Sequence, residues 1–383
     1  MNTLFAGMAG VLVLLAAAAV LLLLRRPAKP QAPALPAVRR AAQADTAQVR
    51  PVTRTAPAQA SATPAVAATT VPAELAGFQH VLADTLTAER RSAFIAMFRD
   101  VPRPPKLLQH LMSPEFLNTA DSSQLVELIG AEPLIAAKVL AAVNSPLYGL
   151  KSPVRSAGQA VTYLGLNSVR SLCLQYILIT AFKADTPQRQ QILDGTWRAS
   201  SLASELAQQL CYRLNMPEAG TTVSAVVLSF LGRLATAATM PQGMLAKVPD
   251  RDFLQRSRAE QGLMGLCAGE IGRLLMVDWG LPAHIAADAA DIDTVLVTPF
   301  SALDSQRNAR LALGYLCARL GEQLACGERT DLLDFDLQHS TAVELHHLQA
   351  GLADARLAPL AEVLREPRLS ADLQRMLAAL SRR

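Results

Sequence analysis

Apolar residues recur at helical spacing along most of the chain from residue 73 onward, and no stretch alternates apolar and polar residues as a half-buried strand would. One helix is predicted to begin at Pro133, because proline fits the first turn of a helix, where its missing N–H leaves no bond unmade. Asn144 is expected to end this helix. Its apolar stripe consists of Ile135, Val139, Ala142 and Val143. The pattern as a whole predicts an all-α fold.

Capping residues next to apolar runs predict further helices. Asp121 to Gln124 should cap one helix, and Ser156 to Gln159 should cap another. Asn167 is expected to cap the apolar run from Val169 to Phe182. The remaining predicted helices cover residues 186–215, 221–240, 262–279, 281–291, 300–326 and 340–381.

Residues 4–24 form an apolar run of 21 residues without a charged side chain. A helix of that length is about 30 Å long and can cross a bilayer. A cleaved secretory signal is the alternative, but it would start with basic residues and have a shorter apolar run. Arg25 and Arg26 follow the run directly. We therefore expect residues 1–24 to be an uncleaved transmembrane anchor of a single-pass inner-membrane protein, with the rest of the chain in the cytoplasm.

Residues 25–72 are expected to form a basic linker rich in proline and alanine. They contain eight prolines and no apolar periodicity, so they cannot build a packed core. They also hold seven basic side chains against one acidic side chain, although the whole chain has a net charge of only +4. The remainder is therefore slightly acidic. This balance argues against a broad nucleic-acid surface, and we expect no nucleic-acid partner.

The five cysteines are odd in number and include no CxxC pair. This pattern favours neither a disulfide framework nor a zinc site. We expect reduced thiols, mostly inside helices, in a reducing compartment.

Three short signatures follow one another in the middle of the chain. They are Glu132-Pro133, Asn144-Ser145 with Tyr148-Gly149, and Leu164-Gly165-Leu166. This ordered set resembles the HDOD domain, a helical relative of the HD phosphohydrolases. The resemblance covers about residues 95–290. It implies an HDOD-like helical domain over residues 73–328, followed by a helical C-terminal extension over residues 329–383.

Catalytic HD enzymes hold metal ions with histidine and aspartate, and the resemblance identifies the matching positions here. Ala199 stands where a histidine would be, Ser229 and Phe230 occupy the His-Asp pair, and Ala268 replaces another histidine. Ala318 stands where an aspartate often lies. A site without imidazole and carboxylate ligands cannot hold the ion. We therefore expect no metal, no cofactor and no catalysis.

One turn and one arginine supply the candidate binding residues. The turn comprises Asn144, Ser145, Tyr148 and Gly149. Asparagine and serine often hydrogen-bond neighbouring backbone in turns, so a structural role is favoured here over a ligand contact. Arg170 could bind an anion near the N-terminus of its helix, although single arginines are usually solvated.

The resemblance implies a role in bacterial signal transduction. We expect a non-catalytic, membrane-tethered signalling or scaffold module that binds protein partners. One alternative is a sensor that binds a nucleotide or cyclic dinucleotide without turnover, for which a cleft lined by Arg155, Arg170 or Arg233 would be needed. The other is a divergent metal-dependent phosphohydrolase.

Overall fold

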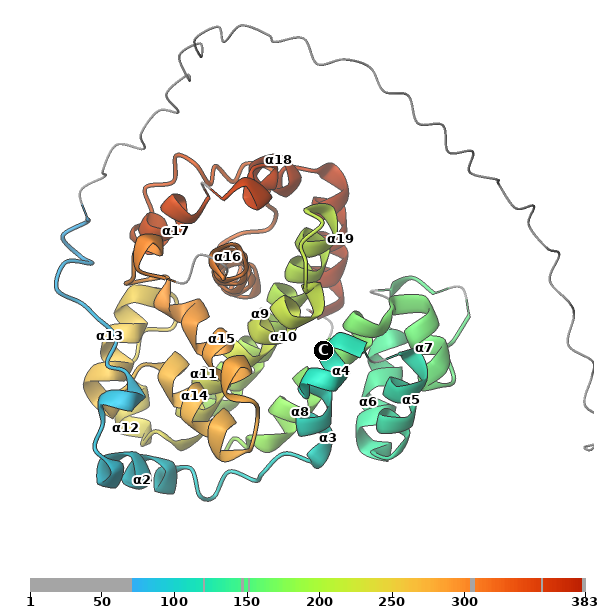
Figure 1. Ribbon diagram of the computed structural model, residues 1–383, viewed down its shortest axis with the longest axis horizontal. Coiled ribbons are helices and arrows are strands. Elements are labelled where there is room, and N and C mark those ends of the chain that lie inside the picture. Colours follow the sequence, from blue (N-terminus) through green and yellow to red (C-terminus); the bar gives the residue numbers. More distant parts are fainter. Residues whose placement is uncertain are drawn as a thin grey trace, which may run out of the picture. The chain divides into compact units, whose positions relative to one another are not determined.

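The computed structural model describes residues 71–119, 121–145, 148–150, 152–303, 307–352 and 354–380 (Figure 1). Within these ranges the chain is all-helical and contains no strand, which confirms the predicted fold class. The predicted anchor, and all but the last two residues of the predicted linker, lie outside the described residues. Both therefore stay predictions.

The helices are numbered as in Figure 1. The first group runs over α2 (Ala88–Met97), α3 (Lys106–Leu111), α4 (Pro114–Thr119), α5 (Ser122–Gly130), α6 (Pro133–Val143), α7 (Ala157–Leu164) and α8 (Leu166–Ala181). The second group runs over α9 (Pro187–Arg213), α10 (Ala219–Ser229), α11 (Leu231–Thr239), α12 (Gln242–Leu245), α13 (Phe253–Met264), α14 (Ala268–Asp278) and α15 (Ala283–Thr294). The last group runs over α16 (Asn308–Ala325), α17 (His346–Gly351), α18 (Leu360–Leu364) and α19 (Pro367–Leu380).

Local capping explains where several helices begin. Pro133 is the first residue of α6, as its position in the sequence predicts. Asp121 caps α5 in a reciprocal capping box with Gln124, which is also confirmed. Ser156 caps α7 by accepting a hydrogen bond from the backbone N–H of Gln159. These starts depend only on residues three or four positions apart, so the sequence predicts them well.

The predicted cap of α8 is wrong. Gly165 takes that position with a φ of 80°, a backbone conformation that glycine adopts without strain. Asn167 instead lies in the first turn of α8, where its side-chain oxygen accepts a hydrogen bond from Arg170. The glycine therefore decides where the chain turns.

Two predicted helices have different boundaries in the structure. The segment 221–240 divides into α10 and α11 at Phe230, whose N–H bonds the carbonyl of Val227, three residues back instead of four. The segment 262–279 joins the end of α13 to α14. Gly265, with a φ of 87°, ends α13 in a left-handed conformation, and the chain turns before α14 begins.

Two hydrophobic cores hold the helices together. In the first, α5, α6 and α7 pack on one another and on α8, and the core continues into α11, α14 and α15. In the second, α9 lies along α16, and α10, α17 and α19 complete it. Figure 1 shows α16 nearly end-on, with α9 and α17 beside it. Residues of the predicted C-terminal extension, such as Leu337 and Leu373, are buried in this second core.

One segment of the described chain is long and apolar enough to cross a membrane. It spans Ala219–Thr239, which comprises α10 and α11. The protein buries 89% of its most apolar stretch, and both helices contribute to the two hydrophobic cores. We interpret it as the central helix pair of the domain.

A close backbone approach fixes the crossing of α11 and α14. Gly232 lies against the start of α14, and a Cβ atom at this position would lie 1.7 Å from the carbonyl oxygen of Ala268. The crossing therefore requires a residue without a side chain, since a backbone carbonyl cannot rotate away as a flexible side chain can.

Gly232→Ala should destabilise the intact protein by about 1–3 kcal/mol, because the added methyl group must push two helices apart. Gly262→Ala is the matched control: this exposed glycine of α13 has open space around its Cβ position. The control should be neutral or more stable by about 0.4–1 kcal/mol. Urea denaturation of both variants measures the difference, and equal midpoints would contradict the close crossing.

Candidate functional site

The positions that correspond to HD metal ligands are buried among helices. Ala199 lies on α9, Ser229 and Phe230 lie where α10 meets α11, and Ala268 is the first residue of α14. Their exposed fractions lie between 3% and 9%. The hydroxyl of Ser229 donates to the carbonyl of its own helix at Val226, at 2.8 Å. Phe230 fills part of the second core with its ring.

These residues do not fit a metal ion. Alanine, phenylalanine and a hydroxyl bonded to its own helix provide no imidazole or carboxylate donor. Ala318 of α16 is likewise buried in the second core. Within the described ranges, no group of three or more His, Cys, Asp or Glu side chains is arranged to hold a metal ion. No catalytic step through a metal can be built from this set of donors.

A cavity of about 420 Å³ lies next to Ala199, and we call it the arginine cavity. Helices α9, α11, α13 and α16 and the loop between α12 and α13 contribute to its wall. Its charged lining residues are Arg198, Arg233, Asp250, Arg251, Arg256, Arg319, Glu322, Glu328 and Glu344.

Buried ion pairs build the inner wall of the arginine cavity. Arg233 donates to the carboxylate of Glu260 at 2.8 Å, with both side chains almost fully buried. Arg319 lies 2.9 Å from the carboxylate of Glu322, which also accepts from Arg256. The Arg319 guanidinium additionally lies over the ring of Phe253, 3.3 Å from its centroid. Each of these inner arginines therefore has an acidic partner.

The electrostatics of these pairs keep the wall charged at neutral pH. Burial raises the pKa of Asp293 to about 6, although Arg319 opposes the shift, so this carboxylate is mostly ionised at pH 7. Burial alone would lower the pKa of Arg256, but the carboxylates of Glu322, Glu260 and Asp293 raise it. Burial alone would raise the pKa of Glu322, but its arginine partners hold that pKa below its ordinary value. The pairs thus neutralise one another.

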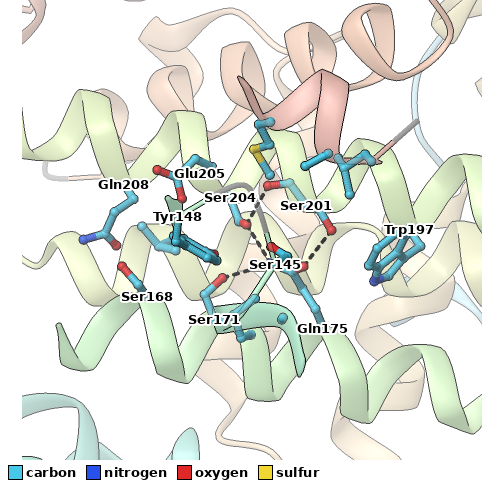
Figure 2. A pocket seen from close by; sticks show the side chains of 16 residues that line it. Ser145, Tyr148, Ser168, Ser171, Gln175, Trp197, Ser201, Ser204, Glu205 and Gln208 are labelled. Atoms are coloured by element: carbon cyan, nitrogen blue, oxygen red, sulfur yellow. Dashed lines mark hydrogen bonds between the residues drawn. The ribbon is translucent and has the colours of Figure 1, made fainter. Parts of the chain in front are cut away.

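A second, smaller cavity lies between α8, α9, α19 and the turn after Asn144, and we call it the serine cleft (Figure 2). Gln175 of α8 occupies its centre. Its amide nitrogen donates to Ser204 at 2.8 Å and to Ser171 at 3.2 Å, and its oxygen accepts from Ser201 at 2.7 Å. This buried network satisfies the polar atoms that line the cleft.

The serine cleft has a volume of about 50 Å³, enough for a few water molecules. Small-molecule sites usually measure about 300–1,000 Å³. Glu205 also lines the cleft, and burial together with the nearby carboxylate of Asp372 raises its pKa. In this conformation the cleft is too small for an organic ligand.

The predicted turn residues divide between a structural role and the serine cleft. The amide nitrogen of Asn144 donates to the carbonyls of Leu140 and Val154, at 2.9 and 2.8 Å, and its oxygen accepts from the N–H of Val154 at 2.7 Å. Ser145 and Tyr148 line the serine cleft (Figure 2).

Gly149 has a φ of 57°, so it provides the left-handed turn that follows. The asparagine thus joins the end of α6 to the chain before α7, and its neighbours face the cleft.

The three arginines considered for anion binding lie in different surroundings. Arg170 is 2% exposed, and its guanidinium donates to Asn167 and fills the space beside Gly220. Because it is buried, its pKa falls to about 10. Arg155 is exposed and lines neither cavity, whereas Arg233 lines the arginine cavity.

Sequence reasoning missed four of the five arginines in this cavity. Their helices are far apart in the chain, and no local spacing connects them.

Comparison with known proteins identifies the fold. A sequence model of the HDOD domain matches residues 101–294, just over half of the chain. The chain belongs to the HDOD domain family. No curated protein matches it.

Several solved structures resemble this HDOD protein. An HDOD domain protein of unknown function from Geobacter sulfurreducens aligns with a TM-score of 0.56 and 18% identity, over 76% of this chain and 96% of that one. A provisionally named signal transduction protein from Marinobacter aquaeolei VT8 aligns with a TM-score of 0.52 and 20% identity, over 79% and 69%.

A provisionally named phosphohydrolase from Shewanella amazonensis SB2B aligns with a TM-score of 0.50 and 18% identity, over 76% and 98%. At these identities the three structures show the shared fold alone.

Asn144→Ala should destabilise the HDOD domain by about 1–3 kcal/mol, because it leaves buried backbone groups of the turn without partners. Ser145→Ala is the control, since this neighbour lines the serine cleft and the change removes only a hydroxyl group. Thermal unfolding of both variants measures the cost. An unchanged melting temperature for Asn144→Ala would show that the three hydrogen bonds do not hold the turn.

Proposed function

We propose that this HDOD protein is a non-catalytic signalling or scaffold module that binds protein partners and is tethered to the inner membrane. The main support is the replacement of the HD ligand positions by Ala199, Ser229, Phe230 and Ala268, all of them buried. A signalling role also fits the provisional name of the Marinobacter relative.

Chemistry supports the absence of catalysis. Hydrolysis of a phosphate by HD enzymes uses a metal ion that polarises the phosphate and lowers the pKa of a bound water. Phe230 places an apolar ring where such an ion would need a carboxylate. The carboxylates closest to Ala199, those of the arginine cavity, are largely engaged by arginines. The phosphohydrolase alternative would need donors from somewhere else in the chain.

Membrane tethering is supported by the sequence. Residues 4–24 are long and apolar enough to span a bilayer, and the basic residues that follow favour a cytoplasmic domain. Residues 25–72 would then separate this domain from the membrane. Proteins that act at a membrane-proximal signalling complex need such reach.

Partner binding is best placed at the surface around the serine cleft. Ser145 and Tyr148 come from the turn that Asn144 fixes, and the last turn of α19 closes the other side. A cavity of about 50 Å³ is too small for an organic ligand, so this region fits a contact with a protein surface better. The buried Gln175 network keeps the floor of the cleft rigid.

The purified full-length protein should contain no stoichiometric metal and should hydrolyse neither nucleotides nor cyclic dinucleotides. Elemental analysis, and assays with added manganese, iron or magnesium, measure this. Stoichiometric metal, or turnover that disappears with a chelator, would contradict the proposal and favour a phosphohydrolase.

The double variant Ser229→His with Phe230→Asp is an informative control. It should remain inactive because the other ligands are still missing. It should also lower stability, because it buries a carboxylate without a partner.

Cross-linking in membranes, with the intact protein as bait, should capture a protein partner, and Tyr148→Ala should reduce that capture. Tyr212→Ala is the matched control, because this tyrosine of α9 is 80% exposed and does not line the cleft. Equal loss with both variants, or no loss with Tyr148→Ala, would contradict a contact at the serine cleft.

A further inference from the structure

The arginine cavity has the dimensions of a ligand site. Its volume of about 420 Å³ lies within the range of roughly 300–1,000 Å³ that is usual for small-molecule sites. Its walls come from rigid helices, and buried ion pairs hold the inner side chains in place. Such a preformed cavity needs little reorganisation when a ligand binds.

Five of the nine charged side chains that line the cavity are already in ion pairs. Arg233 pairs with Asp250 and with the buried Glu260, and Arg256 and Arg319 share Glu322. These groups have little unused charge to offer a ligand. They form the fixed part of the wall.

Two arginines of the cavity are different. Among the described residues, Arg198 of α9 and Arg251 of the loop before α13 form no ion pair and no side-chain hydrogen bond. The Nε atom of Arg198 is buried without a partner, which costs free energy unless a ligand or water bonds to it. Two unpaired guanidinium groups on one cavity match the double negative charge of a phosphate monoester.

Two carboxylates also face this cavity outside any ion pair of the described residues. Glu344 accepts a hydrogen bond from Gln323, and burial raises its pKa. Glu328 lies on the exposed side of the same cavity. These carboxylates would repel a ligand that is only an anion, but they accept hydrogen bonds from N–H groups. The cavity therefore favours a ligand with a phosphate at one end and N–H donors at the other.

We propose that the arginine cavity binds a phosphate monoester of nucleotide size, with its phosphate on Arg198 and Arg251 and its N–H donors toward Glu328 and Glu344. This inference goes beyond the proposed function, since it gives the signalling module a small-molecule input. Guanine carries the N–H donors that carboxylates accept, so guanosine monophosphate is the appropriate probe.

Isothermal titration of the full-length protein in detergent micelles tests the proposal with three probes: guanosine monophosphate, guanosine and inorganic phosphate. The nucleotide should bind, and the other two should bind at least about tenfold more weakly. Arg198→Gln and Arg251→Gln should each weaken nucleotide binding at least about tenfold, because each removes a charge-assisted hydrogen bond. Arg155→Gln is the matched control and should bind as the wild type does, since this exposed arginine lies outside the cavity.

Melting temperatures close to the wild-type value would establish that the variants are folded. No heat from guanosine monophosphate at millimolar concentration would overturn the proposal. So would equal binding of guanosine or of inorganic phosphate, or unchanged binding by the folded variants. A metal-free protein that fails to bind the nucleotide would contradict this inference alone. Metal-dependent hydrolysis of the nucleotide would overturn the proposed lack of catalysis.

Discussion

The structure depends on helices that meet at backbone distance, and a glycine makes each of these meetings possible. On α16, a Cβ atom at Gly321 would lie 2.6 Å from the carbonyl oxygen of Ala199 on α9. Gly232 of α11 has the same relation to Ala268 of α14. Ala199 and Ala268 are both positions where HD enzymes would have histidine. The former ligand positions have therefore become parts of the helix crossings that hold the domain together.

This packing changes what the buried charges can do. In the absence of a metal ion, arginines neutralise the carboxylates near α9 and α16. Glu260 is 1% exposed and would be very costly to bury without Arg233. Buried pairs of this kind add little net stability, but losing one partner costs about 3–5 kcal/mol. They act mainly to fix the shape of the arginine cavity, and that fixed shape lets two further arginines stay unpaired beside it.

The sequence predicts features that depend on neighbouring residues and misses those that depend on distant ones. The start of α6 at Pro133 and the cap at Asp121 follow from local chemistry. The cap at Asn167 was mispredicted because Gly165, two residues earlier, turns the chain first. The arginine cavity draws on α9, α13 and α16, and no spacing along the chain shows that these helices meet. The turn after Asn144 could be located from the sequence, but the cleft beside it could not.

Asn144 shows how a short motif can place a surface without belonging to it. Its side chain makes three hydrogen bonds to the backbone at Leu140 and Val154, so few of its polar contacts remain for a ligand. By joining the end of α6 to the chain before α7, it fixes the segment that carries Ser145 and Tyr148. Those two residues then reach the serine cleft, where α8 and α9 supply a rigid polar floor. The asparagine determines where this surface lies, and its neighbours determine what the surface can contact.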